Sequence, residues 1–304
     1  MARLEIKNLT KDYGDLRALD DLSFAVESGE IFGFVGSNGA GKSTTMRITL
    51  GVLDATSGEV HLNGRKLDFE ARKRIGYMPE ERGLYPKMKV GDQLVYLAQL
   101  HGMSKADAIQ SMEKWTQRLG IDTRRKDTVQ SLSLGNQQRV QLAAALVHEP
   151  DVLILDEPFS GLDPVAVDVM SNVLIERAQA GAPVIFSSHQ LDLVERLCTR
   201  VGIIKSGAMI ANGTVAELQA RAGNLWQVTL EQPSSFAWLT ALPDIQVTSA
   251  TGNAAQFLVQ RDGAEQQVLQ AAATQGPVSS FGRHRIPLAD LFRDAVTVPA
   301  VDEN

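Results

Sequence analysis

The sequence has 304 residues, of which 44% are hydrophobic and 22% are charged, and its formal net charge is −6 at pH 7. This length allows one large domain or two modest ones, and the acidic balance argues against a general nucleic-acid binder. The single cysteine, Cys198, excludes an intrachain disulfide and a cysteine-based metal cluster, as expected for a reducing compartment. The sequence shows no secretory signal and no apolar run near the roughly 20 residues of a membrane span. We therefore expect any membrane-spanning part to be a separate chain.

Alternating apolar residues predict strands in the first part of the chain, at 4–9 and 22–26. Tyr13 lies near the turn between them. Its position alone leaves two alternatives open. The ring could stack on a nucleotide base, or it could pack against its neighbours as most tyrosines do.

A glycine-rich segment at 36–44 follows the apolar run 31–35 and precedes a potential helix at 44–50. In this context, the pattern Gly-x-x-x-x-Gly-Lys-Ser is typical of a phosphate-binding loop. Its glycines let several backbone N–H groups point at a polyanion, and the helix adds its positive dipole end. Lys42 can reach the terminal phosphates, and the Ser43 hydroxyl can hold Mg²⁺. The loop consists of Gly36, Ser37, Asn38, Gly39, Ala40, Gly41, Lys42, Ser43 and Thr44.

The next part of the chain contains strand signals and then a long helical region. A strand with an Asn-Gly turn is predicted at 58–64, and a second strand ends at Pro79. The spacing of apolar residues predicts a helical subdomain at about 90–145. Within it, Ser133 is a candidate helix N-cap. Taken alone, the segment 132–139 fits an ordinary helix cap about as well as a functional site.

A second motif follows the apolar residues 152–155, which predict a strand buried on both faces of a parallel sheet. Asp156 and Glu157 come directly after this strand. Buried carboxylates are costly, so a cation or a reaction must compensate their charge. In a chain with a phosphate-binding loop, we interpret Asp156 as a carboxylate on the Mg²⁺ side and Glu157 as the residue that orients or deprotonates a water.

Two further polar residues follow in the chain. Asp163 and Pro164 predict a helix N-terminus, and capping alone would explain the aspartate. His189 ends a predicted buried strand at 182–189, where ligands bind in parallel sheets. The remaining predicted elements of this part are a helix at 191–198, a strand at 201–204, turns at Gly207 and Gly213, and a helix from Thr214.

The sequence changes character near Ala222, and the part that follows lacks a chemical motif. We therefore expect a first domain at 1–222 and a small α+β domain at 223–304. The last residues, 300–304, are expected to be frayed. The small domain is predicted to contain two strands and two helices, at 225–230, 255–260, 264–273 and 287–295.

With these motifs in this order, the chain resembles the ATP-binding subunits of ABC transporters, and most closely those of ABC-2-type exporters of sodium and drugs. The resemblance covers about residues 3–220. It implies an α/β fold: a P-loop ABC-type ATPase with a mainly parallel sheet, an antiparallel β-subdomain and a helical subdomain, followed by a small C-terminal α+β domain. It also implies a homodimer that binds ATP and Mg²⁺, hydrolyses ATP at the cytoplasmic face of the membrane and powers a separate ABC-2-type permease.

The resemblance assigns roles to the motifs. Tyr13 matches the aromatic residue that stacks on adenine, and 36–44 matches the Walker A loop. The segment 153–156 with Glu157 matches the Walker B strand and its catalytic base. His189 matches the switch histidine that contacts the γ-phosphate.

The resemblance also reassigns the helix cap. The family's signature sequence closes over the ATP of a second subunit, so that Ser133 would face the γ-phosphate across a dimer interface. Asp163 then lies in the loop that links the two nucleotide sites. The signature corresponds to Leu132, Ser133, Leu134, Gly135, Asn136 and Gln137.

Four positions depart from the family's pattern, of which Ser37, in place of a frequent proline, matters little. Leu134 stands where glycine is commoner, and Asn136 stands where glutamine is commoner. Glu80 replaces the usual glutamine that touches Mg²⁺ and couples to the membrane subunit. A glutamate oxygen can still ligate Mg²⁺, although its charge weakens ATP binding unless a cation screens it. The expected metal-side residues are therefore Ser43, Glu80 and Asp156.

Two alternatives remain open: a soluble, non-transport ABC ATPase that acts on ribosomes or DNA, and a regulatory subunit that binds nucleotide without turnover. Ribosome-acting members usually carry two ATPase halves, whereas this chain has one phosphate loop. Members that repair DNA need long coiled coils or zinc-binding cysteines. The presence of Glu157 and His189 argues against the regulatory subunit.

Overall fold

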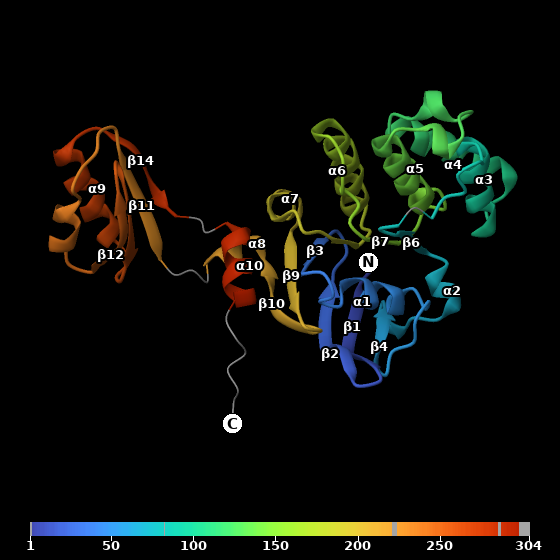
Figure 1. Ribbon diagram of the computed structural model, residues 1–304, viewed down its shortest axis with the longest axis horizontal. Helices are drawn as coiled ribbons and strands as arrows, with labels where there is room; N and C mark the ends of the chain where they lie inside the picture. Colours follow the sequence, from blue (N-terminus) through green and yellow to red (C-terminus); the bar gives the residue numbers. More distant parts are fainter. Residues whose placement is uncertain (1, 82, 221–223, 285–286, 298–304) are drawn as a thin grey trace. The chain divides into compact units, whose positions relative to one another are not determined.

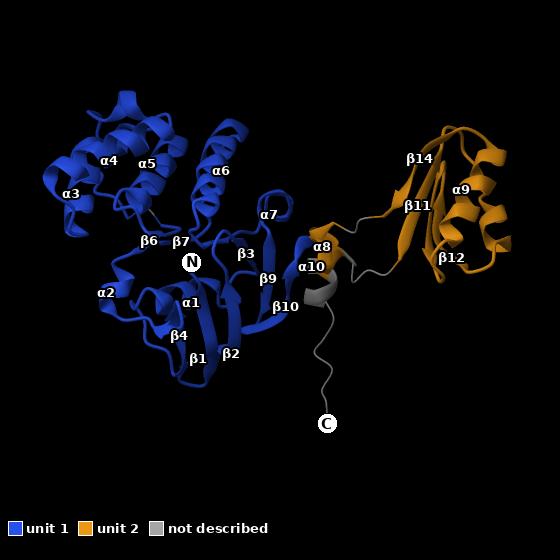
Figure 2. Ribbon diagram, turned by 180° about the vertical axis from the view of Figure 1, so that it is seen from behind, with its two compact units in different colours: residues 1–215 blue, residues 216–304 orange. Residues whose placement is uncertain are grey.

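The computed structural model divides into two compact units, Met1–Val215 and Ala216–Asn304, which are coloured separately in Figure 2. The expected domain boundary, between 222 and 223, falls outside the residues that the structure describes. The described residues are 2–81, 83–220, 224–284 and 287–297.

Six strands form the central sheet of the first unit, in the order β10-β9-β3-β8-β7-β6 (Figure 1). All neighbours pair in parallel except β10, which runs antiparallel to β9. Strands β3, β7 and β8 are buried along their whole length, which explains their continuous apolar sequences. The strands are β3 (Ile31–Val35), β6 (Ile75–Met78), β7 (Val152–Leu155), β8 (Val184–Ser187), β9 (Arg200–Lys205) and β10 (Ala208–Thr214).

An antiparallel sheet of the same unit has the order β2-β1-β4-β5. The Asn-Gly signal is confirmed, because Asn63 and Gly64 form the two-residue connection of a hairpin and have φ of 55° and 75°. Positive φ at both central residues is the requirement of a type I′ turn. The strands are β1 (Leu4–Tyr13), β2 (Leu16–Val26), β4 (Ser57–Leu62) and β5 (Arg65–Lys66).

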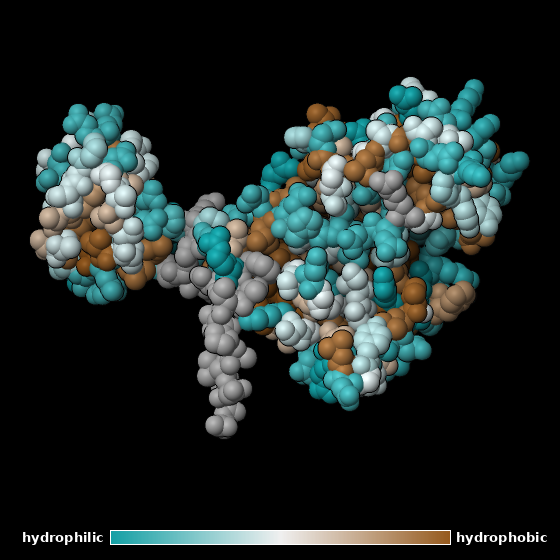
Figure 3. Space-filling view, in the orientation of Figure 1, coloured by the Kyte–Doolittle hydropathy of each residue, from teal (hydrophilic) through white to brown (hydrophobic). Residues whose placement is uncertain are grey.

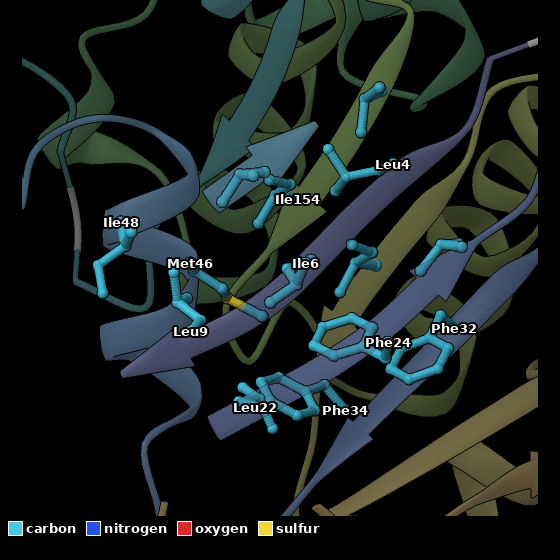
Figure 4. Close-up of a cluster of buried hydrophobic side chains, with 14 of the residues drawn as sticks. Leu4, Ile6, Leu9, Leu22, Phe24, Phe32, Phe34, Met46, Ile48 and Ile154 are labelled. Atoms are coloured by element: carbon cyan, nitrogen blue, oxygen red, sulfur yellow. The ribbon is translucent and has the colours of Figure 1, made fainter. Parts of the chain in front are cut away.

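A buried apolar cluster joins the antiparallel sheet to the central sheet and to α1 (Figure 4). Phe24 of β2 stacks on Phe32 of β3 with 4.9 Å between the ring centroids, and Phe34 lies 5.3 Å from Phe24. Met46 of α1 packs in the same cluster. These contacts hold α1, and with it the phosphate-binding loop, against both sheets.

The predicted helical region contains separate helices, and α3, α4 and α5 are grouped together in Figure 1. The turn at Gly102, with φ of 93°, ends α3, and the Ser104 side chain then caps α4. The helices of the first unit are α1 (Lys42–Thr49), α2 (Phe69–Arg72), α3 (Val90–Leu100), α4 (Lys105–Arg118), α5 (Leu134–Leu146), α6 (Pro164–Gln179) and α7 (Leu191–Leu197), with 3₁₀ turns at Asp122–Arg124 and Val129–Ser131.

Cys198 follows α7 directly and is buried against β3. A Cβ added to Gly33 would lie 2.7 Å from its Sγ, so glycine at this position leaves the room that the thiol needs. Burial raises the pKa of the Cys198 thiol, which keeps the thiol protonated.

The second unit contains an antiparallel sheet in the order β12-β13-β11-β14, with α9 packed against it. Val228, Phe257 and Val268 are fully buried in its apolar core. The elements of this part of the chain are α8 (Val215–Ala220), β11 (Leu225–Leu230), a 3₁₀ turn (Ala237–Ala241), β12 (Ile245–Thr251), β13 (Ala254–Val259), α9 (Ala264–Gln275), β14 (Val278–Arg283) and α10 (Leu288–Thr297).

Three strands differ from the sequence-based expectation. The turn expected at Gly213 is wrong, because this glycine lies inside β10. The strands β12 and β14 were not expected. All three are edge strands, whose mixed polar and apolar sequences carry little strand signal because one side of each remains unpaired. The expected fraying at 300–304 lies outside the described residues.

The surface of the first unit is mostly hydrophilic on the face shown in Figure 3, with hydrophobic side chains interspersed. Exposed apolar residues include Leu16 and Val52. Among the described residues, every helix falls short of the length and apolar character that a membrane span requires.

Candidate functional site

Four neighbouring parallel strands of the central sheet end at one edge, and each is followed by a predicted functional residue. Gly36 follows β3, Glu80 follows β6, Asp156 follows β7, and His189 follows β8. The carboxyl ends of parallel strands form the usual ligand-binding edge of such sheets. A cavity of about 360 Å³ lies here, and it is lined by Asn38, Gly39, Gly41, Lys42, Ser43, Thr44, Glu80, Asp156, Glu157 and His189.

The phosphate-binding loop is shaped by close backbone approach. Gly41 precedes α1 with φ of 111°, and a Cβ added there would lie 2.6 Å from the Leu19 side chain and 2.9 Å from the Ala18 carbonyl oxygen. A residue other than glycine would therefore displace this turn. The loop backbone then delivers its N–H groups and the N-terminus of α1 to the cavity, as an anion requires.

Lys42 is the cation of the cavity and is almost fully buried. Its Nζ donates hydrogen bonds to the carbonyl oxygens of Gly36, at 2.6 Å, and Ser37, at 3.2 Å. Burial lowers the pKa of Lys42, and the carboxylates of Glu157, Asp156 and Glu80 partly oppose this shift. The amine is thus held by the loop that it is predicted to serve and faces three acidic groups.

Asp156 and Glu157 are connected through Ser187 at the end of β8. The Ser187 hydroxyl donates a hydrogen bond of 2.5 Å to Asp156 Oδ1, and Ser187 Oγ accepts a hydrogen bond of 2.8 Å from the Glu157 N–H. Ser187 is fully buried, and Asp156 is nearly so. This bridge fixes the two consecutive carboxylates with respect to each other.

Glu157 adopts a backbone conformation that non-glycine residues rarely use, with φ of 49°. Such conformations cost of order 1–3 kcal/mol and are retained mainly at functional sites. Here the turn directs the carboxylate to His189, whose Nδ1 lies 2.9 Å from Glu157 Oε2. The Glu157 side chain is largely buried, whereas His189 is mostly exposed.

The oxygen atoms near Lys42 fit a cation that is shared with phosphate. Ser43, Glu80 and Asp156 all line the cavity, as expected from the sequence. Among the described residues, no group of three or more His, Cys, Asp and Glu side chains is placed to hold a metal ion by itself. Mg²⁺ suits such a site, because it usually binds one or two carboxylates and completes its shell with phosphates and water.

Other predicted site residues lie outside the cavity lining. Tyr13 is about half exposed, and Lys11 Nζ lies 5.1 Å from its ring centroid. Ser133 and Asp163 cap α5 and α6, and their side chains accept hydrogen bonds from Asn136 N and Ala166 N. Both predicted N-caps are confirmed. The loop residues Gly36, Ser37 and Ala40 support the cavity without lining it.

The signature segment and the loop before α6 lie next to each other in the same chain. A Cβ added to Gly161 would lie 3.0 Å from Leu134 Cδ2, and one added to Gly135 would lie 3.7 Å from Leu162 Cδ2. Leu134 is exposed. The chain therefore presents this segment and loop as one surface, separate from its own cavity.

Sequence reasoning missed two polar residues that position the site. Ser187 holds both carboxylates, and Gln141 of α5 donates hydrogen bonds to the segment that carries Glu80. The sequence gives only a weak indication of the role of Ser187, which lies two residues before His189. It gives no indication of the role of Gln141, because its acceptors lie 62 and 60 residues away in the chain.

Two family models match the chain. The model described as ABC transporter matches residues 19–160. The model described as ATP-binding protein DrrA1-3-like, C-terminal domain, matches residues 213–296. The two matched regions together include parts of both compact units.

Individual proteins are similar over most of the chain. An uncharacterized ABC transporter ATP-binding protein of Bacillus subtilis is 37% identical over 293 residues, which are 96% of this chain and 98% of that protein. The linearmycin resistance ATP-binding protein of the same organism is 35% identical over 72% of each chain. The solved structure of an ATP-binding subunit of an ABC transporter superposes with a TM-score of 0.67 at 31% identity, covering 72% of this chain and 92% of that one.

Proposed function

The chain belongs to the family of ABC transporter ATP-binding proteins, and from this premise we propose that it hydrolyses ATP as a homodimer and thereby drives export through a separate ABC-2-type permease. As a member of this family, the chain is an ATP-binding subunit of an ABC transporter. The activity of the family is ATP hydrolysis. Dependence on Mg²⁺, coupling to transport and a place at the cytoplasmic face of the membrane are the finer parts of the proposal. The ATPase domain would comprise 1–222 and an accessory domain 223–304.

The main support for this proposal is that residues from distant segments meet at the carboxyl ends of the parallel strands. Lys42, Asp156 and His189 come from three distant segments of the chain, yet they line one cavity with the phosphate-binding loop. This combination of buried cation, buried carboxylate and helix N-terminus suits a triphosphate with its metal ion. One relative's name refers to linearmycin resistance, which supports a role in export.

Each side chain has a chemical task in the proposed reaction. Lys42 would bind the terminal phosphates, and Ser43, Asp156 and Glu80 would hold Mg²⁺, which would neutralise phosphate charge. Glu157 accepts the proton of the attacking water, whose oxygen forms a bond to the γ-phosphorus while the bond from this phosphorus to the β–γ bridging oxygen breaks, so that ADP leaves and phosphate is released. His189 contacts the γ-phosphate and, through its 2.9 Å contact, orients the Glu157 carboxylate.

The second copy of the chain would complete the site. Ser133 and the residues around it lie outside the cavity of their own chain, at the exposed start of α5. The first N–H groups of a helix of this length attract phosphate. In the proposed dimer, the segment Leu132–Gln137 contacts the nucleotide of the partner, Asp163 lies between the two sites, and Tyr13 stacks on adenine.

The substitution Glu157→Gln tests the proposal, because glutamine keeps the shape of the side chain but cannot accept the proton. We expect phosphate release to fall by roughly 10²–10⁴ while ATP still binds. The variant should accumulate as an ATP-bound dimer on a sizing column. A variant that remains monomeric with ATP would contradict the dimer, and a native protein that binds ATP without releasing phosphate would be a regulatory subunit.

A further inference from the structure

A buried glutamine of α5 holds the segment that follows β6. Gln141 is 3% exposed, and its Nε2 donates hydrogen bonds to the carbonyl oxygens of Pro79, at 2.6 Å, and Glu81, at 3.1 Å. A primary amide nitrogen carries two hydrogens, so both are used. The two acceptors flank Glu80 on either side, and one side chain thereby fixes the backbone position of this residue.

The position of Glu80 matters because its carboxylate faces the cavity. Glu80 lines the cavity together with Lys42 and Asp156, and its charge is one of those that raise the pKa of Lys42 against the larger effect of burial. The Glu80 side chain itself is exposed, and the carbonyl oxygens on both sides of it are bound by α5. The geometry of Glu80 therefore depends on where α5 lies.

The same helix begins at the segment that would contact the partner's nucleotide. Ser133 caps the N-terminus of α5, and Gln141 lies roughly two helical turns further along, at about 12 Å. A helix of this length moves as a stiff rod, so a displacement at its N-terminus is carried to Gln141. The amide of Gln141 is the hydrogen-bonded connection between this rod and Glu80.

We propose that Gln141 is a positioning residue that sets the Glu80 carboxylate for the metal ion and makes this setting depend on the engagement of Ser133 with the second copy. This inference rests on the proposed function, because it takes Glu80 as a metal-side residue. It adds a link along α5: the position of Ser133, which would contact the partner's nucleotide, would affect the position of Glu80 in the chain's own site.

The test uses the full-length chain and binding of AMP-PNP, a non-hydrolysable ATP analogue, at increasing Mg²⁺ and in EDTA. Gln141→Met keeps the length of the side chain and removes both donors. Because partners of metal ligands contribute tenfold or more to metal affinity, we expect half-maximal AMP-PNP binding to need about tenfold more Mg²⁺. Binding in EDTA should change by less than about twofold, since the hydrogen bonds of Gln141 go to the segment that carries Glu80 and act through the metal site.

Gln93→Met is the matched control. Gln93 is also a fully buried glutamine of the helical subdomain, but its side-chain atoms have no hydrogen-bond partner among the described residues. This variant should leave the Mg²⁺ dependence unchanged. Amide hydrogen exchange at Glu80 and Glu81 should accelerate in Gln141→Met and not in Gln93→Met. If Gln141→Met does not fold, Gln141→Asn, which withdraws the amide by one methylene group, takes its place with the same expected direction.

A double-mutant cycle with Glu80→Ala separates the two hypotheses. Without the Glu80 carboxylate, the substitution Gln141→Met should no longer alter the Mg²⁺ dependence. If Glu80→Ala shifts this dependence and Gln141→Met does not, the inference on Gln141 is wrong and the metal assignment stands. If Glu80→Ala has no effect, the metal assignment itself is wrong. An equal loss of AMP-PNP binding with and without Mg²⁺ would also overturn the inference.

Discussion

The two units of the chain differ in what they bury. Among the described residues, every buried polar or charged side chain lies in the first unit, including Lys42, Gln141, Asp156 and Ser187. The core of the second unit is built from apolar residues around Phe257. Buried polar groups weaken a fold unless they are paired, and in the first unit Lys42 and Asp156 line the cavity while Ser187 and Gln141 hold residues that line it. Both units therefore have an apolar core, but in the described part of the chain only the first also buries polar groups beside the site of the proposed chemistry.

The direction of the strands explains where the chemistry can be. Parallel strands bring their carboxyl ends to one edge, so that segments from distant parts of the chain meet there. The sheet of the second unit is antiparallel, and its strand ends alternate between two edges. Three substitutions test whether the two units are as independent as this contrast implies.

The largest effect is expected for Phe257→Ala in the second unit. Phe257 is fully buried, and its ring centroid lies 6.4 Å from that of Phe281. Removing a buried phenylalanine ring costs about 3–5 kcal/mol, so the unfolding transition of this unit should shift down or disappear in calorimetry. Phosphate release by the first unit should remain at the native rate. A parallel fall in phosphate release would show that the second unit supports the ATPase, and the contrast would break.

The opposite result is expected for Lys42→Ala: phosphate release should fall while the stability of both units is kept. Loss of the buried amine removes a positive charge from the phosphates, and phosphate release should fall by about 10²–10³-fold. Calorimetry without nucleotide should show both unfolding transitions close to those of the native chain, because Lys42 is held by only two loop carbonyl groups. Lys66→Ala, which removes an exposed amine that does not line the cavity, is the control. Equal losses in the two variants would contradict the role of Lys42.

The smallest effect concerns acid stability of the first unit. Burial, and then the charge of the stacked His101, lower the pKa of His148 to about 4. As the pH falls through 6.5, His148 takes up a proton in the unfolded chain, whereas in the folded chain it stays neutral until about pH 4. His148 therefore leaves the free energy of unfolding unchanged above pH 6.5 and lowers it progressively as the pH falls toward 4. At pH 5 the free energy of unfolding should be lower by about 2 kcal/mol.

Urea unfolding at pH 7.5 and pH 5 measures this loss. The substitution His148→Phe keeps a ring against His101 and should abolish the difference that His148 contributes. A transition of the second unit that weakens by the same amount at pH 5 would indicate a general acid effect, and an unchanged pH dependence in His148→Phe would contradict the assignment to this side chain.

Local chemistry was predictable from the sequence, whereas contacts between distant segments were not. The phosphate-binding loop and the N-caps Ser133 and Asp163 could be located because a cap or a glycine turn involves residues within a few positions. The buried strands were found from their apolar runs. Edge strands such as β12 were missed, since their pairing partner decides their structure. Ser187 and Gln141 were missed for the same reason, because their partners lie on other elements.

The buried position of Cys198 has a practical consequence for studies of the proposed dimer. A thiol that stays protonated and inaccessible reacts poorly with maleimide, and it is the sole cysteine of the chain. The native protein should therefore remain unlabelled and can serve as the background for variants with an introduced cysteine. A substitution such as Leu16→Cys, at an exposed position, would accept a single spin label per copy. Distances between labels in two copies could then be followed by pulsed electron resonance as nucleotide is added.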